Sequence, residues 1–432
     1  AFRQLKPLDE HLAWFAWQHD RSRGLTHYGV RHYPDAGLET RLVIMLHNQL
    51  TGQWEALLVD FERDPPYRLD GLRFVPVSQP SQFPAPKKLT DAETAKQIDE
   101  HAQKLADVDL FSGVVLFAKD GKPLLSKAYG YADRDSKTPS RLDTKFRIGS
   151  LNMIFTGVAV AQLVEREKLS FQDKLSRYIR DDWVPWDISR KVSVHQLLTH
   201  TSGLGDKPAY QTAEGTGSVR RTLAHYQRFL AAEKLVYEPG TSAVFSHAGY
   251  LLLGAIIEKV AGASYCDYVR EQVFKPAGIT NTTCNAGKDA AGSVAVAYAR
   301  KWKDGAMKWT GMPHVSDVGG GPAGGGVSTA GDLLKFASAL QGHKLLGRES
   351  TERVLSALSG VGKYGYGVTI RGRAGNRVAE HAAESTGIAA ILSIYLDTGY
   401  TAIVLSNYTG GARLIADKFT ELLELRAARG PA

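Results

Sequence analysis

Strand-forming segments stand early and late in the chain, and helical segments occupy the stretch between them. The early segment, residues 111–133, has two β-rich runs on either side of Asp120-Gly121, a dipeptide typical of a tight hairpin turn. The late segments 389–397 and 400–408 are rich in Ile, Leu, Val and Tyr, as strands are. This order favours an α/β (α+β) fold: one antiparallel sheet built from both chain ends, with flanking helices and an inserted helical region.

Residues 1–88 form a second expected unit, small and β-rich. The runs at 41–49 and 53–62 predict a hairpin. Four prolines between Pro76 and Pro86 predict a linker that limits continuity of helix and sheet. We therefore predict two domains, residues 1–88 and 89–432, with the first separable from the second.

Several helices are expected in residues 89–432. Thr90 and Glu93 have the spacing of a capping box, so a helix of about 17 residues should follow. Further helical stretches are predicted at 154–165, 194–198, 250–260 and 411–428.

Composition excludes several classes of protein. The 432 residues are 43% hydrophobic, which is enough for a large core, and the net charge of +8 is mild. No basic stripe is interleaved with aromatics, which argues against nucleic-acid binding. No run approaches the roughly 18 apolar residues of a membrane span. The first ten residues have no leader pattern, so the chain is either cytosolic or a mature exported form, and we favour a periplasmic or secreted protein.

Two cysteines, Cys266 and Cys284, are present, and their spacing alone does not decide whether they are bonded. No zinc-ligand pattern accompanies them. We expect no metal and no cofactor, and the sequence leaves the oligomeric state open.

Ser150 stands in the stretch FRIGSLNMIFTGVAVAQLVE, between a Gly-Ser turn and an apolar helix. A serine at a helix start has backbone N–H groups and the positive end of the helix dipole beside it, which favours a nucleophile. Serine is also a common helix N-cap, so the local pattern is compatible with a purely structural role.

Five stretches together resemble the serine β-lactamase and penicillin-binding-protein superfamily, in order and spacing, and the class C-like group within it. They lie at 146–165, 191–206, 239–262, 319–340 and 380–408. The resemblance covers about residues 95–425. It implies a serine nucleophile and hydrolysis or acyl transfer on esters or amides. It also implies three motifs: Ser-x-x-Lys, Tyr-x-Asn, and Lys-Thr-Gly or His-x-Gly on an edge strand.

The chain departs from all three motifs. Ser150 matches the nucleophile, but Met153 occupies the lysine position. Phe245 occupies the tyrosine position and His247 the asparagine position. In the third motif His381 matches, whereas Ala382 and Ala383 follow it, with Ala383 where glycine is expected. Glu384 comes next, and its charge would disfavour an oxyanion.

These departures remove the expected proton acceptors. A serine hydroxyl is a weak nucleophile without a neighbouring base, and neither Met153 nor Phe245 can accept a proton. Losing the base of a serine-based unit can cost about 10⁶ in turnover. His247 is the candidate rescuer, either as a base for Ser150 or as a packed side chain bonded to a backbone carbonyl. His381 could bind a carboxylate or cap a strand end, and His200 is expected to hold loops together.

The sequence therefore supports a degenerate family member whose cleft binds a small molecule. Met153, Phe245, Ala382 and Ala383 would make that cleft apolar, so the ligand should be apolar or aromatic, with His247 and His381 as polar contacts. One alternative is an active esterase, peptidase or acyltransferase rewired around Ser150 and His247. Others are a cyclase or isomerase using the apolar cleft, and a deliberately inactivated form of an active hydrolase.

Overall fold

A computed structural model describes residues 8–22, 24–31, 41–66, 68–77, 89–180, 182–206, 223–284, 294–303, 306–312, 321–358 and 360–427. The chain divides into two compact units. Residues 1–110 and 299–310 form the first, and residues 111–298 and 311–432 form the second. The first unit thus extends past the expected boundary at residue 88 and takes in a later segment of chain. The division at 88 stays a prediction, and residues 78–88, where the linker is expected, lie outside the described residues.

The first unit contains a four-stranded sheet in the order β1-β2-β3-β4. Its strands are β1 (Leu25–Arg31), β2 (Arg41–Asn48), β3 (Trp54–Phe61) and β4 (Leu69–Pro76). The expected hairpin is confirmed, because β2 and β3 pair antiparallel from Arg41 opposite Asp60 to His47 opposite Trp54. Helix α2 (Leu8–Ser22), which precedes the sheet, was not expected from the sequence.

Helix α3 (Asp91–Asp107) confirms the predicted capping box. The Thr90 hydroxyl accepts from the backbone N–H of Glu93 at 3.2 Å, and the Glu93 carboxylate accepts from the Thr90 N–H at 2.8 Å. The helix has the predicted length of 17 residues.

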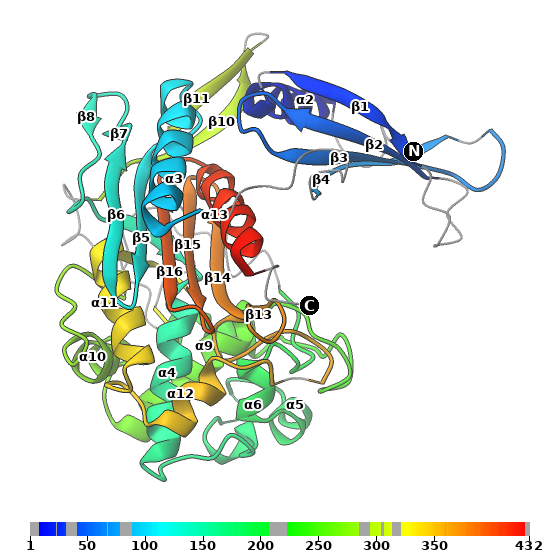
Figure 1. The fold of residues 1–432 in the computed structure, drawn as a ribbon. Coiled ribbons are helices and arrows are strands. Elements are labelled where there is room, and N and C mark those ends of the chain that lie inside the picture. The colour runs from blue at the N-terminus through cyan, green and yellow to red at the C-terminus, as the bar shows by residue number, and fades with distance from the viewer. Residues whose placement is uncertain are drawn as a thin grey trace. The chain divides into compact units, whose positions relative to one another are not determined.

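The second unit is built on a six-stranded antiparallel sheet in the order β13-β14-β15-β16-β5-β6 (Figure 1). The strands are β5 (Gly113–Lys119), β6 (Lys122–Tyr129), β13 (Thr369–Arg371), β14 (Val378–Ser385), β15 (Ile388–Tyr395) and β16 (Tyr400–Ser406). The late strand β16 pairs with the early strand β5, from Tyr400 opposite Lys119 to Ser406 opposite Gly113. The predicted sheet from both chain ends is therefore confirmed.

Helices flank this sheet and form the predicted helical region. Helix α13 (Gly411–Ala427) packs on β15 and β16, and α11 (Ala330–Gln341) packs on β5 and β16. Helices α4 (Asn152–Glu165) and α9 (His247–Ala261) pack on each other beyond one end of the sheet (Figure 1). Residues 152–163 of α4 are all buried, so this helix is core on every side.

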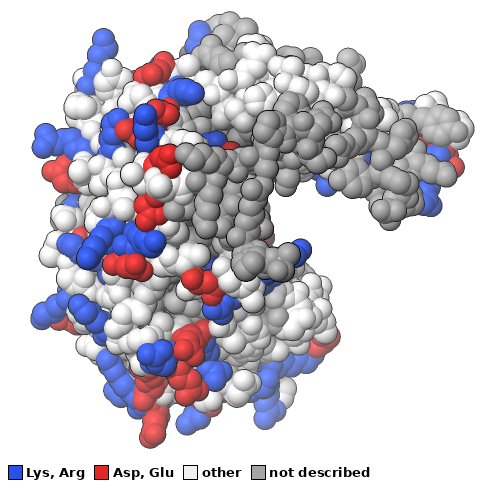
Figure 2. Space-filling model, in the orientation of Figure 1, with Lys and Arg blue, Asp and Glu red and all other residues white. Residues whose placement is uncertain are grey.

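Shorter elements complete the described chain. They are β7 (Tyr131–Asp133), β8 (Thr138–Pro139), β9 (Phe146–Gly149), η2 (Leu175–Arg177), α5 (Trp186–Lys191), α6 (Val194–Leu198), η3 (Leu223–Tyr226), α8 (Gln227–Leu230), α10 (Tyr265–Val269), η4 (Arg270–Phe274), β10 (Ala297–Lys303), β11 (Ala306–Met312), β12 (Gly326–Ser328) and α12 (Arg348–Val354). Within the described ranges, no helix combines the length and apolarity needed to cross a membrane. Among the described residues on the face drawn in Figure 2, acidic and basic side chains are intermixed.

Candidate active site

Ser150 lies between strand β9 and helix α4, where Gly149 turns the chain. Gly149 has a φ of +49°, in the left-handed region that favours glycine. Ser150 is not the helix cap. The cap position of α4 is Leu151, and no side chain makes a cap hydrogen bond there. The structural N-cap interpretation of Ser150 is therefore wrong, and its hydroxyl is directed to another partner.

That partner is His381 on strand β14. Its Nε2 lies 3.1 Å from Ser150 Oγ, although the two residues are 231 positions apart. Its Nδ1 lies 2.7 Å from the backbone carbonyl oxygen of Gly367. Because a carbonyl oxygen can only accept, Nδ1 must carry the proton, and in the neutral ring Nε2 is then the acceptor for the Ser150 hydroxyl.

The surroundings of His381 keep its ring neutral. Burial lowers its pKa from the usual 6.5 to about 4, against the opposing effects of the Gly367 carbonyl and the nearby Glu380 carboxylate. The charge of His247, where protonated, lowers the pKa further. At neutral pH the ring can accept a proton from Ser150 but binds it weakly.

Gly367 holds its carbonyl in place because no larger residue fits there. Its φ is +84°. A Cβ at this position would lie 2.5 Å from the carbonyl oxygen of Met153 and 2.6 Å from Cα of Ile154. The first turn of α4 therefore fixes the carbonyl that orients His381. Sequence reasoning missed this residue, since a backbone acceptor leaves no side-chain signal.

His247 stands at the first residue of α9 and is bonded elsewhere. Its Nδ1 lies 2.8 Å from Oδ1 of Asp206. Neither outcome expected from the sequence matches this geometry, because the partner is a carboxylate and not Ser150 or a backbone carbonyl. In the described part of the chain, the side-chain partner of Ser150 Oγ is His381. Asp206 was missed because nothing in its local sequence indicates a histidine partner.

Phe245 is half-buried between two histidine rings. It stacks on His200 with ring centroids 4.8 Å apart, and His247 meets it edge-on at 5.0 Å. The His200 Nδ1 accepts from the backbone N–H of Ser246 at 3.1 Å. The His200 carbonyl accepts from the Tyr237 hydroxyl at 3.1 Å. His200 thus holds loops together, as expected, and complete burial lowers its pKa to about 3.

Met153, at the lysine position, is fully buried in the core. Its backbone N–H donates to the Ser150 carbonyl at 2.9 Å. The Met153 side chain therefore lies in the core at the first turn of α4 and has no exposed surface. A ligand could touch it only if neighbouring atoms moved, which modifies the expectation that Met153 lines an open apolar cleft.

Strand β14 separates the remaining candidates onto two faces, because successive side chains point to opposite sides. His381 and Ala383 share the face toward Ser150, and a Cβ on Gly149 would lie 3.3 Å from that of Ala383. Glu384 lies on the other face, where it is exposed and 3.9 Å from Arg413. Ala382 shares that face by alternation and is half-buried. The expected influence of Glu384 on an oxyanion is thus weakened by its orientation.

Strand β13 pairs with only part of the backbone edge of β14. Strand β13 pairs with Val378, Ala379 and Glu380 only. On the other side β14 pairs with β15 along its whole length, to Ser385 opposite Ile388. The segment from His381 onward therefore has a sheet edge beside Ser150 that β13 does not cover.

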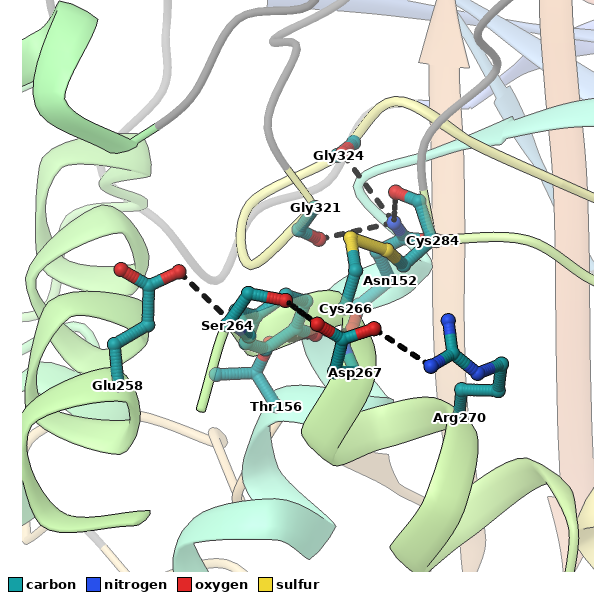
Figure 3. Close-up of a disulfide and its surroundings, with 11 residues drawn as sticks. Asn152, Thr156, Glu258, Ser264, Cys266, Asp267, Arg270, Cys284, Gly321 and Gly324 are labelled. Carbon is teal, nitrogen blue, oxygen red and sulfur yellow. Dashed lines mark hydrogen bonds and ion pairs between the residues drawn. A yellow bond between two sulfur atoms is a disulfide. The ribbon is translucent and has the colours of Figure 1, made fainter. Parts of the chain in front are cut away.

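A disulfide and an amide secure the start of α4 (Figure 3). Cys266 and Cys284 are bonded, with Cα atoms 5.7 Å apart. The Asn152 side-chain amide donates to the carbonyls of Cys284 at 3.0 Å and Gly321 at 2.9 Å. Two residues after Ser150, the helix is therefore tied to the disulfide and to the glycine-rich loop. The structural part played by Asn152 was not foreseen.

Comparison with known proteins identifies the family. A family model described as Beta-lactamase matches residues 98–426. Penicillin-binding protein 4* of Bacillus subtilis is 27% identical over 340 residues, covering 72% of this chain and 71% of that protein. A putative penicillin-binding protein, PbpX, of the same organism is 27% identical over 381 residues, covering 86% and 90%.

A solved structure agrees with these sequence relatives. A penicillin-binding protein from Bacillus halodurans has a TM-score of 0.66 and 28% identity, covering 73% of this chain and 98% of that one. The chain belongs to the β-lactamase family, and its fold is that of the serine β-lactamases and penicillin-binding proteins.

Proposed function

We propose that this chain is a degenerate β-lactamase-family hydrolase, in which acyl transfer is strongly reduced and the site around Ser150 binds a small ligand. The observation that carries the proposal is Met153, a fully buried side chain without a basic atom at the lysine position. Phe245 likewise has no hydroxyl at the tyrosine position. General-base help is typically worth 10²–10⁴-fold, so its loss should make turnover very slow.

The ligand is proposed to be apolar or aromatic. The half-buried ring of Phe245 and the methyl group of Ala383 replace the polar centre that the family motifs supply, whereas Ala382, on the other face of β14, does not contribute to it. Polar contacts are confined to His381 and His247 in this proposal. A penicillin, whose carboxylate and reactive carbonyl need polar partners, should therefore be a poor substrate.

The disulfide supports a periplasmic or secreted location. Cys266 and Cys284 are bonded, and such bonds persist mainly in oxidising compartments. Labelling of this protein in intact cells, with a reagent that does not enter the cytoplasm, tests this proposal. Protection of the protein in intact cells, with labelling only after lysis, would contradict it.

Intact-mass spectrometry tests the proposed loss of acyl transfer. The protein is incubated for hours with a penicillin and, separately, with an activated aryl ester, beside the Ser150→Ala variant. We expect no penicilloyl adduct and at most slow, Ser150-dependent acylation by the ester. A stable penicilloyl adduct on Ser150 would overturn the proposal, because it would require an efficient base.

One observation favours a second candidate function, an esterase or acyltransferase with a rewired base. The hydrogen bond of 3.1 Å between Ser150 Oγ and His381 Nε2 is the contact that a serine nucleophile makes with a histidine base. Rapid turnover of the aryl ester in the same experiment, without a penicillin adduct, would favour this second function.

A further inference from the structure

We propose that His381 is the general base for Ser150 and that the backbone carbonyl of Gly367 positions it. The inference rests on the proposed function in so far as Ser150 is the nucleophile of the residual reaction. It assigns a catalytic role to a residue for which the sequence suggested carboxylate binding or strand capping.

The geometry gives each atom of this unit a defined role. Gly367 O accepts from Nδ1 at 2.7 Å, which directs the unprotonated Nε2 toward Ser150 Oγ at 3.1 Å. In serine hydrolases with a triad, a buried carboxylate fixes the histidine tautomer in the same way. Here a neutral carbonyl does so, and it is itself fixed because Gly367 lies against the first turn of α4.

The other histidines near the site make no hydrogen bond to Ser150 in the described structure. His200 is fully buried, and its Nδ1 already accepts from the Ser246 N–H. His247 Nδ1 lies on the Asp206 carboxylate, and its ring packs edge-on against Phe245. Met153 has no basic atom. Of the described side chains, His381 is therefore the base in place to take the Ser150 proton.

Acylation of Ser150 by an aryl ester needs no further reactant. As Oγ of Ser150 forms a bond to the acyl carbon of an aryl ester, its O–H bond breaks and the proton passes to His381 Nε2. When the tetrahedral intermediate collapses, the bond to the aryl oxygen breaks. His381 then returns the proton to the departing aryl oxide, which leaves as a phenol.

Charged and titratable groups around His381 set the pH range of this step. Glu380, on the same strand, raises its pKa, and His247, on α9, lowers it. His200, on the loop after α6, has a pKa lowered by burial and by the charges of both histidines where they are protonated, so it stays neutral. Because burial has the largest effect on its pKa, the His381 ring stays unprotonated, and so able to accept the Ser150 proton, well below pH 6. The rate at which Ser150 is labelled should therefore stay constant until the pH approaches about 4.

A fluorophosphonate probe tests the assignment. The Ser150 Oγ–P bond forms, the P–F bond breaks, and the released proton and fluoride leave to solvent. Labelling rates are compared for the wild type, His381→Asn, His247→Asn and Ser150→Ala. In His381→Asn the amide can still donate to Gly367 O but offers no base to Ser150. We expect its labelling to fall at least about 100-fold.

A matched histidine outside the site controls for the substitution itself. His343 is exposed and has a φ of +58°, a conformation that asparagine tolerates, so His343→Asn should label at the wild-type rate. Melting curves show whether each variant is folded. If His381→Asn does not fold, the tautomer of the wild-type His381 ring decides: a proton on Nδ1 supports the assignment, and a proton on Nε2 overturns it.

The outcomes separate this inference from the proposed function. Labelling that survives in His381→Asn but is lost in His247→Asn would overturn the inference and leave the degenerate site standing. No labelling of Ser150 in the wild type would also overturn it, while agreeing with a site that only binds ligands. Rapid acylation by a penicillin would overturn the proposed function whatever the histidine variants show.

Discussion

The side-chain amide of Asn152 donates a hydrogen bond to the backbone carbonyl of Cys284 at 3.0 Å. This contact joins the disulfide to the helix turn that follows Ser150. The disulfide is therefore linked to the start of α4 through Asn152, and its contribution should be to stability.

Removing the disulfide should destabilise the protein while keeping its fold. Replacing both Cys266 and Cys284 by Ser is expected to cost about 2–4 kcal/mol of unfolding free energy, because the bond closes a loop between residues 18 positions apart. Denaturant unfolding of the oxidised, reduced and double-variant proteins measures this. Equal midpoints for the oxidised and reduced wild type would contradict the expectation.

Gly367→Ala should be strongly destabilising. The new methyl group would lie within 2.6 Å of the first turn of α4, at a backbone φ of +84°. We expect a loss of several kcal/mol together with slower labelling of Ser150, because the carbonyl that positions His381 must move. Gly375→Ala is the matched control. It also has a positive φ, of +86°, but nothing lies within 4 Å of its added Cβ. Equal losses in both variants would show that backbone strain alone is responsible.

Met153→Lys alone should not restore full activity. The lysine would be buried without the tyrosine and asparagine that the family motifs provide, and an uncompensated buried charge costs about 3–5 kcal/mol. The triple variant Met153→Lys, Phe245→Tyr, His247→Asn should hydrolyse an aryl ester faster than any single variant. Steady-state rates of aryl ester hydrolysis by the three single variants and the triple variant test this coupling. Equal rates for Met153→Lys and the triple variant would refute it.

Acid should destabilise the second unit through His200 and His381. Both have pKa values lowered by burial, to about 3 and about 4, so the unfolded chain binds more protons than the folded one below about pH 6.5. Their stabilising contribution is complete above that pH and is lost as the pH falls toward the folded values. Each group should contribute at most about 1.4 kcal/mol per pH unit to the slope of the unfolding free energy against pH. Urea unfolding at pH 7, 6 and 5 should show a shallower slope for His381→Asn, and an unchanged slope would count against the buried neutral ring.

Local sequence signals predicted the framework but not the contacts of the site. The Asp120-Gly121 turn and the Thr90–Glu93 capping box act over a few residues, so the hairpin and the helix start could be foreseen. Helix α6 begins and ends at the expected residues, Val194 and Leu198.

The Ser150–His381 bond spans 231 positions and depends on how β14 is placed against the start of α4, which no local pattern encodes. Motif order placed both residues in one family site, but the sequence offered His247, and not His381, as the candidate base. The Gly367 carbonyl and the Asp206 carboxylate, which set the partners of the two histidines, could be found only in three dimensions.

The most direct test of the account is the ¹⁵N NMR signature of the His381 ring across pH, assigned by comparison with His381→Asn. We expect one tautomer at pH 7, with the proton on Nδ1 and a bare Nε2, and no titration until the pH falls well below 6. A ring with its proton on Nε2 would contradict the claim that His381 is the proton acceptor of Ser150, and a ring that titrates near pH 6.5 would contradict the lowered pKa that its burial predicts.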